Sequence, residues 1–465
     1  MKMYSNFDIN IYLANLPSSV KAIDVSYKNL THLPDLSRFT NLLELNCSNN
    51  NLNYLPPFNP TLTHVNCSFN NLHSIPPLNE ELVHLNCCFN PDLTCLPELN
   101  DKLKRLLCSD SELTHLPPLK HLEYLCCARN ELTTLPDLPD TMFHLDCSSN
   151  QIVHFPCAQF HLKLKKLFCS ENKIKYLPMF NVELECLFCF KNKLKTLPKL
   201  NKKLELLECH HNQLKMIPEF NMKLQYLDCS YNKLEYLPNL NDELVHLNCK
   251  RNKLKSLPIL NYNIQYLKCD FNQITVLPCL NNCLYTLECS NNRLDFLPKL
   301  NFHLIYLNCS NNRLKELPIL NENLEDLNCV NNQLYILPLI HTKLRNIVFS
   351  KNPIYNVLFA NNNNSHHHQY FYAMNANGEL DQMANYVNYI NENVNQTFLL
   401  REKIQRLHHF RSLFYTLKYK DRFRDFLWDK IRRPKIEAKY HPSNLQKLID
   451  ELNEEDDLTE LLESW

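Results

Sequence analysis

Cysteine and asparagine are the residues with chemical potential that recur most regularly in this chain of 465 residues. A cysteine lies three positions before an asparagine again and again, as Cys309 and Asn312 do in LNCSNNRLKELPIL (307–320). The asparagines from Asn172 to Asn352 follow one another at intervals of twenty residues, and the upstream copies keep this interval with small slips. The cysteines of the series are Cys47, Cys67, Cys87, Cys108, Cys127, Cys147, Cys169, Cys189, Cys209, Cys229, Cys249, Cys269, Cys289, Cys309 and Cys329.

Such a row of thiols could form disulfides, bind zinc or pack in the interior as reduced side chains. If the cysteines lie on adjacent strands about 4.8 Å apart, disulfides are not excluded by distance. A closed zinc site needs four ligands that converge from several directions, which a single file does not supply. Cysteine is also a small and readily buried residue. We therefore expect these cysteines to pack in the interior as reduced thiols.

The residues around each cysteine predict the elements that position it. Leu304, Leu307 and Cys309 alternate with polar or exposed positions, as a short strand requires. Asn312 is expected to face inward, where its amide bonds backbone groups left unpaired by the bend. Pro318 fixes an extended return arm without needing a backbone donor. One such turn cannot bury its apolar edge alone, so neighbouring turns must stack.

The motif L-x-x-L-x-L-x-x-N-x-L, with cysteine in the third leucine place, resembles leucine-rich repeat proteins. The arm LPxL is similar to the short class of about twenty residues known from bacterial effectors. The resemblance implies an α/β solenoid, a leucine-rich repeat horseshoe with one short parallel strand per turn on its concave side. Val25 and Phe349 fill the cysteine place at the two ends. We expect an N-terminal cap at 1–19 and about seventeen turns over 20–353.

Composition excludes several classes of enzyme. Gly378 is the only glycine, so neither a P-loop nor a dinucleotide-binding fingerprint is possible, and the turns are expected to use Asn, Pro, Asp and Ser. Neither H-E-x-x-H nor G-x-S-x-G occurs. Lysine plus arginine (49) equals aspartate plus glutamate (49), so overall charge selects neither nucleic acid nor membrane. We expect no catalytic residue, no cofactor and no metal, and nucleic acid is not the expected partner.

The outward positions of the middle turns are apolar, whereas those of the outer turns are mostly polar. Apolar patches with polar rims are often interaction sites. The candidate partner-binding residues are Tyr124, Lys166, Phe168, Phe188, Phe190, Leu206 and Tyr226, with Glu208, His210 and His211 at the edge. Two alternatives stay open: the C-terminal segment folds back over this patch, or the aromatics are scattered surface residues. The column of His64, His84 and His144 is interpreted as plain polar surface.

The repeats stop after Pro353. An Asn/His-rich linker is expected at 354–378 and a helical segment at 379–465. Residues 401–447 hold fourteen Lys/Arg against five Asp/Glu, so this segment either binds an anionic surface or caps the last turn. The stretch 431–449 resembles a short signature of uncharacterised leucine-rich repeat proteins from mimivirus-like giant DNA viruses.

The expected function is a non-enzymatic protein–protein interaction scaffold that binds a protein on its concave face. The alternative is an adaptor for ubiquitin ligase machinery, in which the repeats select the target. Bacterial effectors of the LPxL class pair their repeats with a cysteine-dependent ligase, but no cysteine follows Cys329 here. No secretory signal and no apolar run long enough to span a membrane is visible, so a cytoplasmic location is expected, in the host cytoplasm if the protein is viral.

Overall fold

The computed structural model describes residues 7–156, 163–179, 182–341 and 343–354. The chain divides into two compact units, Met1–Val387 and Asn388–Trp465. The described residues all belong to the first unit. The expected linker and helical segment lie outside the described residues, apart from Ile354 at the start of the linker.

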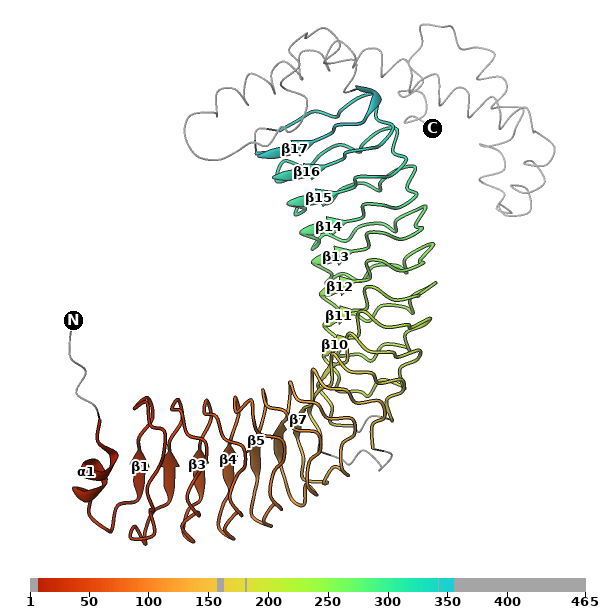
Figure 1. Ribbon diagram of the computed structural model, residues 1–465. Helices are drawn as coiled ribbons and strands as arrows, with labels where there is room; N and C mark the ends of the chain where they lie inside the picture. The colour runs from red at the N-terminus through yellow and green to blue at the C-terminus, as the bar shows by residue number, and fades with distance from the viewer. Residues whose placement is uncertain (1–6, 157–162, 180–181, 342, 355–465) are drawn as a thin grey trace, which may run out of the picture. The chain divides into compact units, whose positions relative to one another are not determined.

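The described part is a stack of short parallel strands, each provided by one turn of the repeat (Figure 1). One helix, α1 (Ile9–Ala14), precedes the stack and buries Ile9 and Leu13. The strands are β1 (Ala22–Asp24), β2 (Glu44–Asn46), β3 (His64–Asn66), β4 (His84–Asn86), β5 (Arg105–Leu107), β6 (Tyr124–Cys126), β7 (His144–Asp146), β8 (Lys166–Phe168), β9 (Cys186–Phe188), β10 (Leu206–Glu208), β11 (Tyr226–Asp228), β12 (His246–Asn248), β13 (Tyr266–Lys268), β14 (Thr286–Glu288), β15 (Tyr306–Asn308), β16 (Asp326–Asn328) and β17 (Asn346–Val348).

Each strand pairs in parallel with the next strand along the chain, and equivalent residues of neighbouring turns face each other. The middle residue of every strand is buried, as Leu227 is in β11, whereas its two neighbours face outward. The outward residues therefore form two columns along the sheet. We call this surface the strand face. The fold is the leucine-rich repeat solenoid expected from the sequence.

The inward asparagines form a hydrogen-bonded ladder that is interrupted at Ser111, whose buried hydroxyl has no hydrogen-bond partner among the described residues. Asn212 shows the pattern: its Nδ2 donates to the carbonyl oxygens of Cys189 at 2.9 Å, Cys209 at 3.1 Å and His210 at 3.3 Å. Its Oδ1 accepts the N–H of Leu194 at 2.9 Å. Each amide thus joins its own turn to the preceding turn, and both of its polar atoms are used.

The fifteen cysteines of the repeat are buried side by side as unpaired thiols, which confirms the sequence-based expectation. Burial raises the pKa of Cys47 and that of Cys309 to about 12. A thiolate is therefore strongly disfavoured at neutral pH, and these side chains act as small apolar groups rather than as nucleophiles. Val25 and Phe349 fill the same column at its two ends, as expected.

The second residue after each cysteine adopts a left-handed backbone conformation, with φ between 50° and 58°. Asn49 and Ser149 suit the prediction that Asn, Pro, Asp and Ser make the turns. That prediction is only partly right, because Phe69, Phe89 and Lys191 occupy equivalent places. Such conformations are unfavourable for bulky residues and persist where surrounding contacts fix them. Here the asparagine ladder holds the next residue, and neighbouring side chains pair: the rings of Phe69 and Phe89 stack with centroids 4.1 Å apart.

A second asparagine ladder lies on the return arms and was not predicted from the sequence. Asn281 Nδ2 donates to the carbonyl oxygens of Asn261 at 2.6 Å and Ile264 at 3.0 Å. Asn301 repeats this arrangement one turn later, with bonds to Asn281 and Leu284. The turns are therefore tied together by amides on the arm side as well as behind the strands.

Candidate interaction surface

The seven residues predicted to bind a partner all lie on or directly beside the strand face. The first residues of strands β6, β8, β10 and β11 are Tyr124, Lys166, Leu206 and Tyr226. The third residues of β8 and β9 are Phe168 and Phe188, and Phe190 follows the buried Cys189. The sequence pattern therefore placed each side chain on the correct side of its strand.

The structure brings two of the predicted phenylalanines into direct contact. The rings of Phe168 and Phe188 stack across β8 and β9, with centroids 4.7 Å apart and planes inclined by 16°. Phe190 instead stacks on His210 of the next turn, at 4.4 Å and 10°. His210 was expected only at the edge of the patch, yet its ring extends the aromatic surface.

Tyr124 reaches this cluster through a histidine that sequence reasoning had treated as plain polar surface. The ring of Tyr124 stacks on that of His144 at 4.0 Å, and His144 lies 5.4 Å from the ring of Phe168. The guanidinium group of Arg105 covers the other side of Tyr124, 4.3 Å from the ring centroid. The resulting file runs from Arg105 to Phe188 over five neighbouring strands.

Leu206 and Tyr226 form the other part of the predicted patch. They are register partners on β10 and β11, and Tyr226 stacks on His246 of β12 at 4.4 Å. The ring of Tyr266 lies 5.7 Å beyond His246. Histidines thus link aromatic residues in both parts, and the signal that would have revealed them is their place in the same columns as the tyrosines.

The stacking makes the predicted patch less accessible than expected. Lys166 is exposed, whereas Tyr124, Phe168, Phe188, Phe190, Leu206 and Tyr226 are half-buried. Each ring offers an edge or one face to solvent while its neighbour covers the other side. The surface is therefore already ordered, which reduces the entropy lost when a partner binds.

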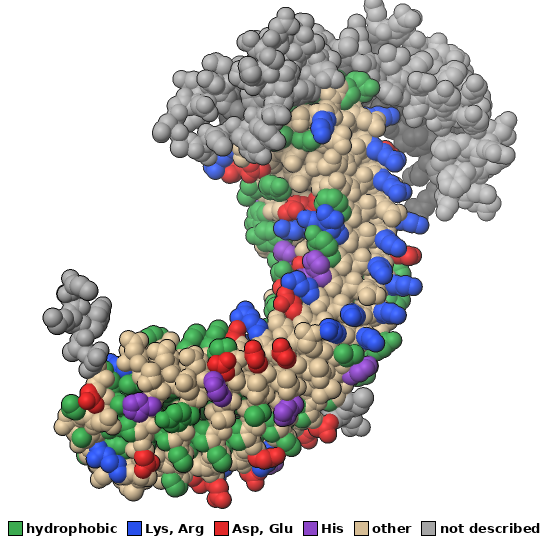
Figure 2. All heavy atoms as spheres, in the orientation of Figure 1, with side chains coloured by type: hydrophobic (Ala, Val, Ile, Leu, Met, Phe, Trp, Pro, Cys, Tyr) green, Lys and Arg blue, Asp and Glu red, His purple; other side chains and the backbone are tan. Residues whose placement is uncertain are grey.

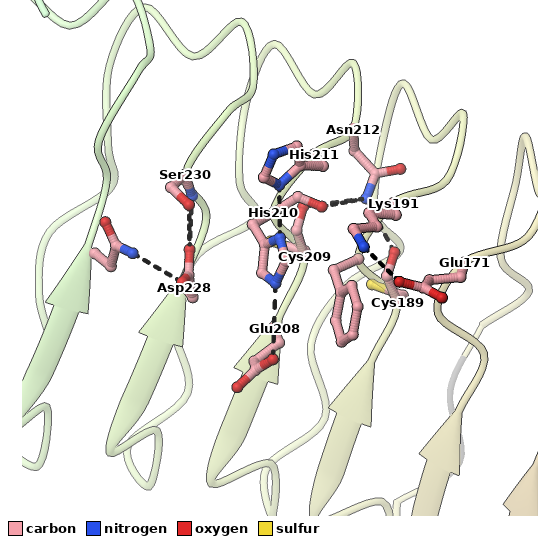
Figure 3. Close-up of polar contacts among 12 residues, drawn as sticks. Glu171, Cys189, Lys191, Glu208, Cys209, His210, His211, Asn212, Asp228 and Ser230 are labelled. Carbon is pink, nitrogen blue, oxygen red and sulfur yellow. Dashed lines mark hydrogen bonds and ion pairs between the residues drawn. The ribbon is translucent and has the colours of Figure 1, made fainter. Parts of the chain in front are cut away.

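A polar cluster on β10, on β11 and in the residues that directly follow them contains Glu208, His210, His211, Asp228 and Ser230 (Figure 3). His210 Nε2 lies 3.9 Å from Glu208 Oε2, and His210 Nδ1 lies 2.8 Å from Nδ1 of His211. Asp228 accepts hydrogen bonds from the N–H of Ser230 at 2.9 Å and from its hydroxyl at 2.6 Å. Glu208 and Asp228 are register partners, so two carboxyl groups lie side by side next to the apolar surface.

Partial burial shifts the pKa values of histidines and of one glutamate in this region in the direction that favours their uncharged forms. Burial is the main cause that lowers the pKa of His144, His210 and His246. Burial, followed by repulsion from Asp228, raises the pKa of Glu208. The imidazoles are therefore mainly uncharged at neutral pH, which suits their role as stacking partners.

The residues that the structure describes contain no group of three or more His, Cys, Asp or Glu side chains arranged to hold a metal ion. Among the same residues, no helix is both long enough and apolar enough to cross a bilayer. The arrangement on the strand face offers stacking surfaces, apolar edges and a pair of carboxyl groups, all of which can contact another molecule.

The fold has clear counterparts among solved structures. YopM, a leucine-rich effector protein from Yersinia pestis, is 28% identical, with a TM-score of 0.57; the match covers 71% of this chain and 88% of that one. A leucine-rich repeat protein of Leptospira interrogans is 26% identical, with a TM-score of 0.56, and the match covers 74% and 93% of the two chains.

A third counterpart shares the column of thiols. The functional domain of InlJ from Listeria monocytogenes, described as including a cysteine ladder, is 27% identical, with a TM-score of 0.50. The match covers 68% of this chain and 69% of that one. No protein-family model matches the chain, and no curated protein matches it either. The counterparts are leucine-rich repeat proteins, a fold typical of scaffolds for protein interaction.

Proposed function

We propose that the protein is a non-enzymatic scaffold that binds a protein partner on its strand face, the concave side in leucine-rich repeat solenoids. The observation that carries this proposal is the file of ordered rings from Tyr124 to Phe188, with Phe190 and His210 beside it. Aromatic residues in a central, partly desolvated position are the usual anchors of protein interfaces.

The proposed contact combines an apolar centre with a polar rim. Phe168, Phe188 and Phe190 supply the apolar surface, and Leu206 with Tyr226 extends it. Lys166 and Glu208 give the rim charges of both signs. A partner with apolar side chains surrounded by polar groups would bury the phenylalanine edges and pair with these charges.

The test replaces Phe168, Phe188 and Phe190 together by serine. Proteins captured by the wild-type chain from homologous cells or infected host cells are identified first, and the affinity of each purified candidate is then measured by calorimetry. We expect the triple variant to bind the partner at least tenfold more weakly. Because the three rings are half-buried and stacked, circular dichroism and thermal unfolding verify that the variant is still folded.

A matched control exists in the same chain. Phe69 and Phe89 form another stacked pair, with 47% and 38% of their surface exposed, but they lie beyond the strands and outside the patch. Replacing both by serine should leave partner binding unchanged. Equal affinity of the wild type and the triple variant would rule out the patch, and equal losses in both variants would indicate a general effect of lost aromatic surface.

The adaptor alternative depends on residues 379–465, which lie outside the described residues. It predicts that these residues, fused to a carrier protein, capture components of the ubiquitin machinery. A scaffold without this activity captures none. The proposed setting is the cytoplasm, the host cytoplasm if the resemblance to giant-virus proteins reflects origin, and imaging of a fluorescent fusion in host cells tests it.

A further inference from the structure

Two columns of residues flank the buried Leu or Ile that follows each inward asparagine, or that follows Lys28 and Ser111 in the two turns where these residues take its place. One column precedes this apolar residue and the other follows it. We call the two columns together the flank. In the turns of β1–β7 the flank contains no lysine or arginine: its residues are Asn29, Thr31, Asn51, Asn53, Asn71, His73, Asp92, Thr94, Glu112, Thr114, Glu131, Thr133, Gln151 and Val153.

In the turns of β8–β15 the same columns are strongly basic. Eleven of their sixteen residues are cationic, and only Glu235 and Asp295 are acidic. The cationic residues are Lys173, Lys175, Lys193, Lys195, Lys215, Lys233, Lys253, Lys255, Arg293, Arg313 and Lys315. All eleven are exposed. Figure 2 shows a file of Lys and Arg side chains along the edge of this part of the array.

The backbone keeps these cations in register. The N–H of Lys193 donates to the carbonyl oxygen of Ile174 at 2.9 Å, and Lys253 makes the same bond to Leu234 at 2.8 Å. One such bond joins each turn to the next along the flank, so the positive charges repeat at intervals of one turn, about 5 Å, except in the turn of β13, where the flank residues are Gln273 and Thr275. The net charge of the whole chain is zero, so it gives no indication of this local excess of positive charge.

Within the described part of the chain, the cations of the flank are not paired with carboxylate groups. Among the described residues, none of the eleven forms an ion pair. Other lysines of the same turns do: Lys203 bonds Glu183 at 2.7 Å and Lys268 bonds Glu288 at 3.0 Å. Lysines in this fold can therefore form ion pairs with acidic residues of an adjacent turn, but among the described residues the flank cations form none.

Exposed aromatic residues adjoin the second column at every third turn. Tyr176 has 60% of its surface exposed, Tyr236 53% and Phe296 52%. A cationic track that follows a polymer backbone, combined with aromatic rings on which bases stack, is how proteins bind single-stranded nucleic acid without sequence preference.

We propose that the flank of β8–β15 binds single-stranded nucleic acid through its phosphates, independently of base sequence. A narrow and extended line of cations, interrupted in the turn of β13 where the flank carries Gln273 and Thr275, matches a polymer with regularly spaced anions better than it matches an acidic protein, whose charges are scattered. The strand face takes no part in this contact. The proposal therefore stands apart from the scaffold function, and one surface can be removed without the other.

The test uses the full chain and a fluorescein-labelled RNA of mixed sequence, with fluorescence anisotropy as the readout. The flank variant carries Lys193→Gln, Lys195→Gln, Lys253→Gln and Lys255→Gln, because glutamine already occupies this flank at Gln213 and Gln273. The control variant carries the same substitution at four exposed lysines of the return arms: Lys199, Lys202, Lys223 and Lys299. Both variants lose four positive charges. Circular dichroism and thermal unfolding verify that both are folded.

We expect the flank variant to bind the RNA at least tenfold more weakly than the control variant at low salt. If four phosphate contacts are lost, the slope of log affinity against log salt concentration falls by about 3. Equal losses in both variants would reduce the effect to net charge and overturn the proposal, as would a wild-type chain that binds neither RNA nor single-stranded DNA. Flank-dependent capture by phosphatidylserine vesicles, without capture of oligonucleotides, would assign the surface to membranes instead.

Discussion

The turns of β1–β7 and those of β8–β15 share an interior and differ at the flank. In both regions the middle strand residue and the repeat cysteine are buried, and the amide of an inward asparagine joins adjacent turns. The flank, by contrast, carries Glu112 and Glu131 in the first region and Lys193 and Lys253 at corresponding places in the second. The fold therefore dictates which residues occupy the interior and leaves the surface free to acquire separate binding properties.

The largest expected effect tests whether the two interiors are equivalent. Leu125 in β6 and Leu227 in β11 are both fully buried middle residues. Replacing either leucine by alanine should destabilise the array by about 2–5 kcal/mol, because large-to-small core changes remove apolar contacts and leave a cavity. Urea unfolding followed by circular dichroism measures the change. A variant that unfolds like the wild type would show that its region is not packed as described.

A somewhat smaller loss is expected when one amide of the ladder is removed. Asn130 and Asn252 each donate to three carbonyl oxygens and accept one N–H from the preceding turn. Substitution by alanine leaves the buried N–H of Leu113 or Leu234 without its acceptor, whereas most of the carbonyl oxygens keep a second donor, so the expected cost is about 1–3 kcal/mol. Equal losses in the two variants would confirm equivalent ladders. A loss of stability in only one variant would show that the ladders of the two regions differ. Urea unfolding measures both losses.

Acidification should destabilise both regions moderately. Burial lowers the pKa of His84 and His144 in the first region and of His210, His211 and His246 in the second. The unfolded chain therefore binds more protons once the pH falls below about 6.5, the ordinary value for histidine, and stability declines from there downward. We expect the thermal unfolding midpoint to be lower at pH 5.5 than at pH 7.5.

Two carboxyl groups oppose this trend at lower pH. Burial raises the pKa of Glu208 and that of Asp270, so the folded state takes up their protons earlier than the unfolded state as the pH falls. The destabilising effect of their burial is therefore relieved as the pH falls through the raised pKa values toward the ordinary range of carboxyl groups. Replacing His144 and His246 by glutamine should flatten the loss between pH 7.5 and 5.5. An unchanged pH profile would contradict the assigned direction.

The smallest effect on stability is expected from moving the basic flank into the first region. Replacing Asn51, Asn53 and Asn71 by lysine alters three exposed positions, so each change should shift the free energy of unfolding by less than about 0.5 kcal/mol. Added to the flank variant, these lysines should restore part of its RNA binding in the anisotropy assay. Failure to restore any binding would mean that the second region contributes more than its cations.

Much of the interior was predictable because the same residue types return at one interval. Cys309 and Asn312 are placed by their spacing, and a column of small apolar side chains beside a column of amides fits only a narrow solenoid turn. The left-handed residues were less predictable. Phe69 and Lys191 adopt a conformation that their types disfavour, because contacts from neighbouring turns fix it.

The sequence predicted which residues lie on the surface, but not which of them contact one another. The sequence placed Phe168 and Phe188 on one face, but whether a ring stacks on its neighbour depends on side-chain rotamers in two turns. For the same reason His144 and His210 were not recognised as stacking partners. The predicted segments at 354–378 and 379–465 stay predictions, because apart from Ile354 they lie outside the described residues.

The inward asparagine ladder also bears on how such a gene changes in length. Every amide reaches back to the same atoms of the turn before it, so an in-frame duplication or deletion of one repeat rejoins the ladder without a mismatched bond. The uniform interval from Asn172 to Asn352 makes the turns of this stretch interchangeable in this respect. Array length can therefore vary between descendants while each surviving turn keeps its own surface.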